Sequence, residues 1–119
     1  MATQDEVLKF LADLKVKANI WPIVFRDDRG KNAQTLADLE ITPMQRETIV
    51  KELQVNDFSE GPIADTLYKT TGMWVFGKMV KQVEVYIKIT MGEFGGNPIC
   101  ISFHTAEKAM TYPYKNNLL

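Results

Sequence analysis

The 119-residue sequence has little of the chemistry on which many protein sites depend. Its one cysteine, Cys100, excludes a disulfide framework and a zinc site built on cysteines, and it fits a reducing cytosol. Its one histidine, His104, argues against a catalytic metal site. No apolar run approaches the length of a membrane span, and residues 1–6 are polar and acidic, unlike a signal peptide. We therefore expect a cytoplasmic domain that needs no metal or other cofactor.

What the sequence does contain is enough for one globular domain. Hydrophobic residues make up 45% of the chain and charged residues 24%, both usual values for such a domain. Residues 1–60 hold eight Lys and Arg against eleven Asp and Glu, whereas residues 61–119 hold six lysines against four acids. Such a split can arise by chance, or the basic half can present a surface to an anion such as phosphate.

The first 60 residues have the pattern of helices. An apolar stripe from Val7 to Leu14 follows Thr3-x-x-Glu6, which has the spacing of a capping box, and this helix should end near Val16. A second start signal, residues 42–45, combines a capping box with proline at the first helical position. Around these helices we expect an extended run at 20–25, a charged turn at 26–32, a short helix at 33–39 and a loop at 56–62.

From residue 72 onward the period changes from helical to alternating. Residues 74–80 and 83–90 predict a hairpin that turns near 81–82, and residues 99–104 predict a third strand. Helices first and strands later indicate an α+β domain, with N-terminal helices packed on one face of a C-terminal antiparallel sheet. The single domain 1–119 should then have a helical part at about 4–60, a sheet part at about 72–104 and a tail at 105–119.

The alternation also sorts the strand residues into two faces. On the second strand the odd-numbered residues from 83 to 89 are apolar and should face the core, as should Ile99, Ile101 and Phe103 on the third. If the two strands share a sheet, the residues gathered on its outer face are Tyr86, Lys88, Cys100, Ser102 and His104.

Side chains of this kind can cut a phosphodiester of RNA without a metal. The 2′-hydroxyl of the RNA attacks phosphorus, and the protein supplies a base, a cation for the phosphate charge and an acid for the leaving oxygen. Lysine suits the cation role, and histidine can be acid or base because its unperturbed pKa is about 6.5. Tyrosine can stack on a base, or transfer a proton if nearby cations lower its pKa. The same residue types also occur on ordinary solvated sheet faces.

The sequence also resembles a known family over most of the chain from about residue 25 to residue 104. The residues that carry the resemblance are Asp57-Phe58, Trp74, Val85–Thr90, Ile101-Ser102-Phe103, and Arg26-x-x-Arg29 followed by Leu-Ala-Asp-Leu at 36–39. They are similar to the MqsR family of bacterial toxins. The resemblance implies a RelE-like fold and a metal-independent endoribonuclease, an mRNA interferase, that cuts mRNA. It also implies a cognate antitoxin with a helix-turn-helix domain, as in type II toxin–antitoxin systems.

Carried over by position, the resemblance implies that Tyr86 and Lys88 lie on the catalytic face and that His104 replaces a basic residue of the family. Glu60 stands where the family has lysine, and Val75 where it has glutamine. We expect Lys88 to stabilise the phosphate, His104 to act as general acid or base, and Tyr86 to position or stack on a base. The residues expected to bind RNA are Arg26, Arg29, Lys31, Lys78 and Ser102, although the first three also fit a solvated turn held by Asp27 and Asp28.

Two other functions fit the same sequence. The departures at Glu60 and Val75 favour a non-enzymatic regulator that binds a protein partner through the same sheet. The modest net charge favours an RNA-binding or small-molecule-binding module without turnover.

Overall fold

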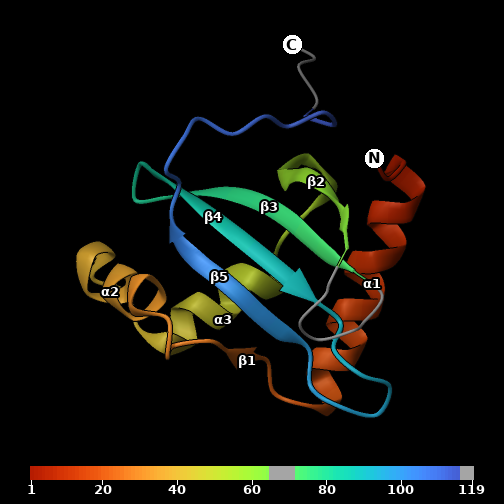
Figure 1. The fold of residues 1–119 in the computed structure, drawn as a ribbon, viewed down its shortest axis with the longest axis horizontal. Helices are drawn as coiled ribbons and strands as arrows, with labels where there is room; N and C mark the ends of the chain where they lie inside the picture. The colour runs from red at the N-terminus through yellow and green to blue at the C-terminus, as the bar shows by residue number, and fades with distance from the viewer. Residues whose placement is uncertain (65–71, 116–119) are drawn as a thin grey trace.

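The fold is an α+β arrangement, as predicted, in a computed structural model that describes residues 1–64 and 72–115. The strands form one sheet in the order β1-β5-β4-β3-β2, with α1 and α3 behind it and α2 beside β5 (Figure 1). No helix in these two ranges is long and apolar enough to cross a membrane. The elements are α1 (Gln4–Ile20), β1 (Val24–Phe25), α2 (Gly30–Leu39), α3 (Pro43–Lys51), η1 (Val55–Asp57), β2 (Phe58–Ile63), β3 (Met73–Val80), β4 (Val83–Thr90) and β5 (Ile99–Thr105).

Both predicted capping boxes are present. The hydroxyl of Thr3 accepts from the Glu6 N–H at 3.2 Å, and the Glu6 carboxylate accepts from the Thr3 N–H at 2.8 Å. The second box, at the start of α3, has the same reciprocal pair at 3.1 and 2.8 Å. Helix α1 continues past the predicted end near Val16 to Ile20, because the buried Ala18 extends its apolar stripe by one turn.

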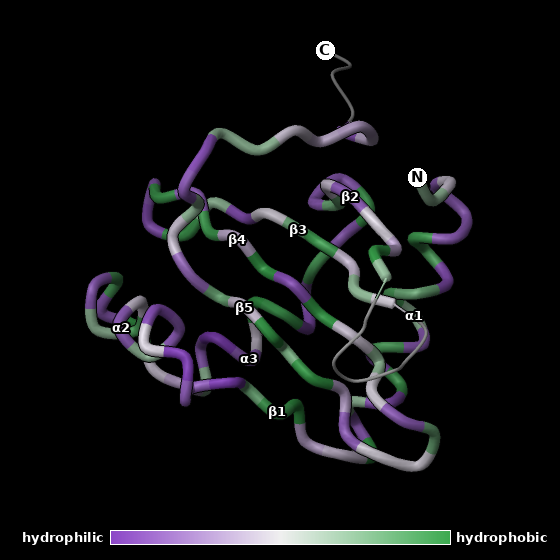
Figure 2. Tube along the Cα trace, in the orientation of Figure 1, coloured by the Kyte–Doolittle hydropathy of each residue, from purple (hydrophilic) through white to green (hydrophobic). Residues whose placement is uncertain are grey.

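The strands pair mostly antiparallel. β3 and β4 form the predicted hairpin, and its turn residues Lys81 and Gln82 have φ values of 51° and 70°, as a type I′ turn requires. β4 pairs antiparallel with β5, and β1 adds a short parallel strand at the far edge of β5. Green and purple segments alternate along β4 in Figure 2, which reflects one face against the core and one face away from it.

The predicted loop at 56–62 is wrong, because Phe58–Ile63 form strand β2, paired antiparallel with β3. Gly61 and Pro62 signalled a turn. They are tolerated here because β2 is an edge strand, where a residue without an N–H need not break a ladder on both sides. Phe58 is completely buried and supplies the apolar contact that holds the strand on the sheet.

An irregularity in β5 overturns the predicted orientations of Cys100 and Ile99, since Cys100 pairs with the core residue Ile89 and Ile99 pairs with Thr90 on the opposite face. Lys88 pairs with Ser102, but the next residue on β4, Ile89, pairs with Cys100, so Ile101 is an extra residue on β5. The bulge shifts the alternation by one residue at this point. Cys100 therefore joins the core with 1% of its surface exposed, whereas we predicted it on the outer face.

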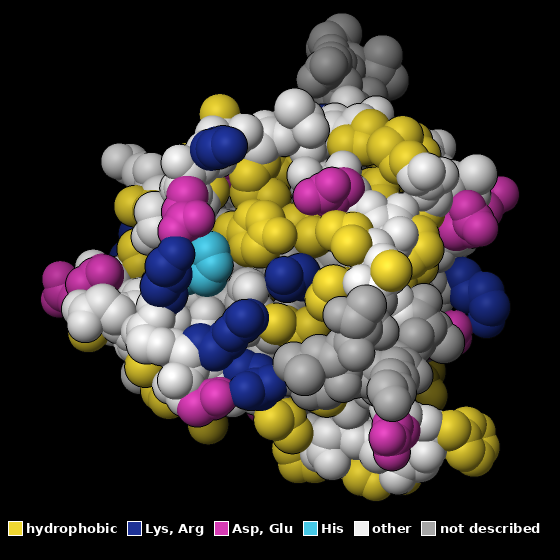
Figure 3. Space-filling view, in the orientation of Figure 1, with side chains coloured by type: hydrophobic (Ala, Val, Ile, Leu, Met, Phe, Trp, Pro, Cys, Tyr) yellow, Lys and Arg dark blue, Asp and Glu magenta, His cyan; other side chains and the backbone are white. Residues whose placement is uncertain are grey.

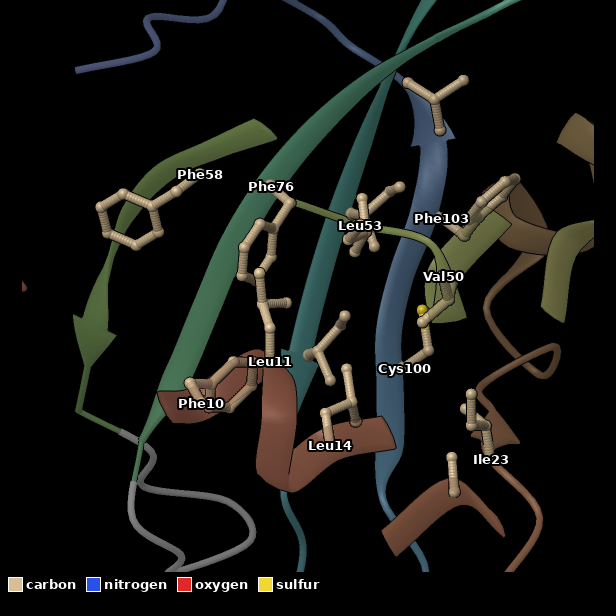
Figure 4. Packing of buried hydrophobic residues seen from close by; sticks show 14 of the residues in the cluster. Phe10, Leu11, Leu14, Ile23, Val50, Leu53, Phe58, Phe76, Cys100 and Phe103 are labelled. Atoms are coloured by element: carbon tan, nitrogen blue, oxygen red, sulfur yellow. The ribbon is translucent and has the colours of Figure 1, made fainter. Parts of the chain in front are cut away.

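The core lies between the sheet and the helices α1 and α3 (Figure 4). Phe76 from β3 and Phe103 from β5 are completely buried, and Leu14 from α1 nearly so. Phe10 stacks on Trp74 with ring centroids 4.4 Å apart. Each such side chain contributes on the order of 1.5–3 kcal/mol through burial. The helices thus cover one face of the sheet and leave its other face to the residues described next.

Candidate functional site

The outer face of the sheet is hollowed into a cleft of about 800 Å³. Strands β4 and β5 form its floor, and its walls come from the start of α2, from β2 and from residues 107–111. Figure 3 views this face and shows basic side chains beside the single histidine. The predicted site residues that line the cleft are Arg29, Lys31, Tyr86, Lys88, Ser102 and His104.

Two residues of the predicted set do not line this cleft. Arg26 forms an ion pair with Asp28 at 2.7 Å. Lys78 pairs across the hairpin with the buried Val85, so it belongs to the helix side of the sheet, where it contacts Asp57 at 3.3 Å. The structure therefore brings together the strand residues and the basic residues at the start of α2, but not the lysine of β3.

The strand register arranges the outer face of the sheet, which includes the cleft floor, in two rows that run across the strands. The first row is Glu60, Val75, Lys88 and Ser102, and the second is Gly77, Tyr86 and His104. Val75 and Ser102 of the first row are buried, so the longer side chains that extend from this row into the cleft are those of Glu60 and Lys88.

The His104 imidazole is held in one orientation by two contacts. Its ring stacks on Tyr86 with centroids 5.3 Å apart and an interplanar angle of 15°. Its Nδ1 lies 3.0 Å from the carbonyl oxygen of Thr105. A carbonyl oxygen can only accept, so Nδ1 carries the proton, and Nε2 is the atom that can gain or lose one.

Tyr86 has the environment of a neutral phenol. Burial raises its pKa above the ordinary value of 10.0, and the negative charge of Glu60 raises the pKa further. The alternative in which nearby cations lower this pKa and prepare Tyr86 to transfer a proton therefore does not hold. A phenol that stays protonated at neutral pH can donate a hydrogen bond or stack on a nucleobase.

Asn32, which sequence reasoning missed, fixes the start of α2 against β5. It is 2% exposed, and its Nδ2 donates to the carbonyl oxygens of Arg26 at 2.8 Å and Ile101 at 2.9 Å. Its Oδ1 accepts from the Phe103 N–H at 3.0 Å. These bonds hold Arg29 at the cleft rim, where its Nη1 also lies 3.4 Å from the Ile101 carbonyl oxygen. In the sequence, Asn32 stood in a predicted charged turn, and no local pattern identified its distant partners.

Residues 106–115 of the predicted tail lie within the described structure and pack against the sheet, and we call them the C-terminal strap. Residues 116–119 lie outside the described residues. Met110 N–H and the Tyr112 hydroxyl donate to the two carboxylate oxygens of Glu84, at 3.2 and 2.6 Å. The Tyr112 ring lies directly against Gly77, where no side chain stands in its way. The strap therefore crosses the outer face of the hairpin and closes one side of the cleft.

An ion pair links the strap to α2 at the cleft wall. Lys31 on α2 pairs with Glu107 on the strap, and a hydrogen bond from Lys31 lowers the pKa of Glu107. Both side chains are largely exposed, so we expect the pair to add little to stability. As a result, the ammonium group of Lys31 at the cleft wall already has the Glu107 carboxylate beside it.

Other reactive groups of the described chain do not offer a second site. Burial raises the pKa of the Cys100 thiol to about 12, so it is no nucleophile at neutral pH. Within residues 1–64 and 72–115, no cluster of three or more His, Cys, Asp or Glu could hold a metal ion. The cleft is the place where titratable groups and cations converge.

Comparisons with protein-family models, with curated proteins and with solved structures find no match for this chain. The MqsR resemblance and the RelE-like fold it implies therefore stay predictions from the sequence.

Proposed function

We propose that the protein is a metal-independent endoribonuclease that cuts mRNA, acting as the toxin of a type II toxin–antitoxin pair. The observation that carries the proposal is the convergence of Lys88, His104 and Tyr86 in one cleft with Arg29 and Lys31 at its rim. A cation and groups that transfer protons are what 2′-hydroxyl attack on a phosphodiester needs from a protein, and an aromatic side chain can position a base.

Each group has a role that follows from its surroundings. The Lys88 ammonium stabilises the charge that gathers on the phosphate oxygens, and Arg29 and Lys31 hold neighbouring phosphates. His104 exchanges a proton through Nε2, because Nδ1 is engaged by the Thr105 carbonyl oxygen. Tyr86 donates a hydrogen bond or stacks on a base. The cleft volume of about 800 Å³ is within the range of small-ligand sites.

The experiment that tests the proposal is cleavage of a labelled single-stranded RNA by the purified protein in the presence of EDTA. We expect His104→Ala and Lys88→Met to lower the cleavage rate by roughly 10²–10⁴-fold with unchanged melting temperatures. Lys9→Met is the matched control for Lys88→Met, because Lys9 is an exposed lysine on α1 that pairs with Asp13 outside the cleft. A folded wild-type protein that leaves every RNA intact, alone and on ribosomes, would overturn the proposal.

The cellular counterpart is growth after tightly controlled expression. The wild-type chain should arrest growth and produce new, discrete RNA ends by primer extension, and His104→Ala should do neither. Co-expression of a helix-turn-helix antitoxin encoded beside the gene should restore growth.

A second candidate is a module that binds RNA or a protein partner without turnover. The observation favouring it is that Glu60 and Glu107 also line the cleft and oppose its cations. Retention of an RNA oligonucleotide by the wild-type protein, without cleavage, would identify an RNA-binding module. Specific capture of a folded protein partner that His104→Ala still binds would identify the regulator.

A further inference from the structure

Glu60 is a titratable group of the cleft that has no role in the mechanism above. It lies on β2, the strand for which the sequence predicted a loop. Its side chain is exposed and lines the cleft. It pairs across the sheet with Val75, which in turn pairs with Lys88. Glu60 therefore stands in the same row as Lys88, on the side of Lys88 opposite to β5 and His104.

The separation of Glu60 and His104 across the sheet can accommodate an in-line displacement at phosphorus. Glu60 and His104 are three strands apart and two register positions along. With about 4.8 Å per strand and about 3.3 Å per residue, their backbones are roughly 16 Å apart. Side chains that lean toward each other from the sheet, each reaching about 4–5 Å, can bring carboxylate and imidazole to within roughly 6–8 Å. A base and an acid that each contact one apical oxygen at about 3 Å need a gap of up to roughly 9 Å, which these two side chains can span.

Resting on the proposed ribonuclease function, we propose that Glu60 is the general base and His104 the general acid of one cleavage step, with the phosphate held over Lys88 between them. The influence of Glu60 on Tyr86 supports this placement, since its charge acts on a hydroxyl in the middle of the cleft. The lysine expected from the resemblance at this position is thus replaced by a group with a different chemical role.

The step balances without a co-reactant. The Glu60 carboxylate takes the proton of the 2′-hydroxyl while O2′ forms a bond to phosphorus. The bond from phosphorus to O5′ breaks, its electron pair passes to O5′, and protonated His104 donates a proton from Nε2 to that oxygen. The products are a 2′,3′-cyclic phosphate and a 5′-hydroxyl. Exchange with water returns Glu60 to the carboxylate and His104 to the imidazolium.

Glu107, the other carboxylate that lines the cleft in the described residues, is not equivalent to Glu60. It is paired with Lys31, and this contact lowers its pKa and makes it a weaker base. Glu47→Gln is the control for Glu60→Gln, because it makes the same charge change on α3, where Glu47 pairs with Lys51 outside the cleft. The other titratable groups that face Glu60 across the cleft are Arg29 and Lys31 from α2, Tyr86 and Lys88 from β4, His104 from β5, and Lys108 from the strap.

The first experiment compares single-turnover cleavage rates in EDTA. We expect Glu60→Gln to reduce the rate by roughly 10²–10⁴-fold, and Glu47→Gln to change it by less than about threefold. Glu60→Asp, which keeps the carboxylate and shortens its reach, should retain more activity than Glu60→Gln. Melting temperatures are measured for all variants. If Glu60→Gln cleaves at the wild-type rate, or if the variant with aspartate is as inactive as the variant with glutamine, Glu60 is not the base.

The second experiment separates the two roles with an RNA in which sulfur replaces the bridging O5′. A thiolate leaves without a proton, so this substrate needs no general acid. His104→Ala should recover to within about tenfold of the wild-type rate on it, whereas Glu60→Gln should stay at its reduced rate. Rescue of Glu60→Gln instead would exchange the two roles and overturn the assignment.

The two proposals fail in distinguishable ways. Wild-type protein that is folded and cleaves neither RNA refutes the ribonuclease function itself. Wild-type protein that cleaves RNA, with Glu60→Gln equally active, refutes only the role of Glu60 and leaves the function standing.

Discussion

The contact between Tyr112 and Gly77 gives a prediction whose size can be derived from the structure. A Cβ added at Gly77 would lie 2.8 Å from two carbons of the Tyr112 ring and nearer still to its hydroxyl oxygen. Gly77→Ala must therefore displace a ring whose hydroxyl donates to Glu84 at 2.6 Å. Losing a hydrogen bond to a charged group costs about 1.5–3 kcal/mol. Straining the packing instead costs about 1–3 kcal/mol.

Both routes give a loss of about 2 kcal/mol in the free energy of unfolding. With a urea slope of about 1–2 kcal/mol per molar, the midpoint of urea unfolding should fall by roughly 1–2 M. In the background of Tyr112→Ala the obstacle is gone, so the same Gly77→Ala should be neutral or stabilising by up to about 1 kcal/mol. Equal losses in the two backgrounds would refute the reasoning, because the close approach would then not be why glycine occupies this position.

Three further predictions concern groups outside the cleft. Cys100, whose pKa is raised to about 12 by burial, should resist alkylation at pH 8 and react only under unfolding conditions, as measured by mass spectrometry. Arg46 is 3% exposed and pairs with the half-exposed Asp27 at 2.7 Å. Asp27→Asn should therefore lower the free energy of unfolding by about 2 kcal/mol in urea titrations, more than Arg46→Met, because only the first leaves a buried charge without its partner. A hydrogen bond from the Thr3 N–H lowers the pKa of Glu6 below its ordinary 4.5, so its stabilisation is present above pH 4.5 and lost as the pH falls through the lowered value. Glu6→Gln should accordingly flatten the fall of the melting temperature below pH 4.5.

The parts of the fold that the sequence predicted are those determined by local chemistry. The capping boxes at Thr3 and Thr42 mark two helix starts because they involve residues only three positions apart. The hairpin of β3 and β4 follows from alternation on both sides of a short turn. Tyr86, Lys88 and His104 shared a face because each lies on a stretch of strand with regular period.

The parts that the sequence did not predict depend on partners far along the chain. β2 contains Gly61 and Pro62, which are typical turn residues; only the pairing of β2 at the edge of the sheet shows that they belong to a strand. The bulge at Ile101 leaves the hydrophobic pattern of β5 unchanged, since both Ile101 and the inward-facing Cys100 are apolar. Arg46 and Asn32 are buried polar residues that form hydrogen bonds across 19 and 71 positions of the chain, with Asp27 and Phe103 respectively. The cleft walls, and with them the surroundings of Glu60, follow from these long-range contacts.

The extra residue in β5, Ile101, serves the contact with α2 and not the pairing of the sheet. Without Ile101, Cys100 would still face inward and Ser102 outward, so the sheet itself does not need this residue. What needs it is α2, because the Ile101 carbonyl oxygen receives Asn32 and lies beside the Arg29 guanidinium. Deleting Ile101 should therefore loosen the basic rim while preserving the strand order and leaving every side chain on the floor of the cleft unchanged.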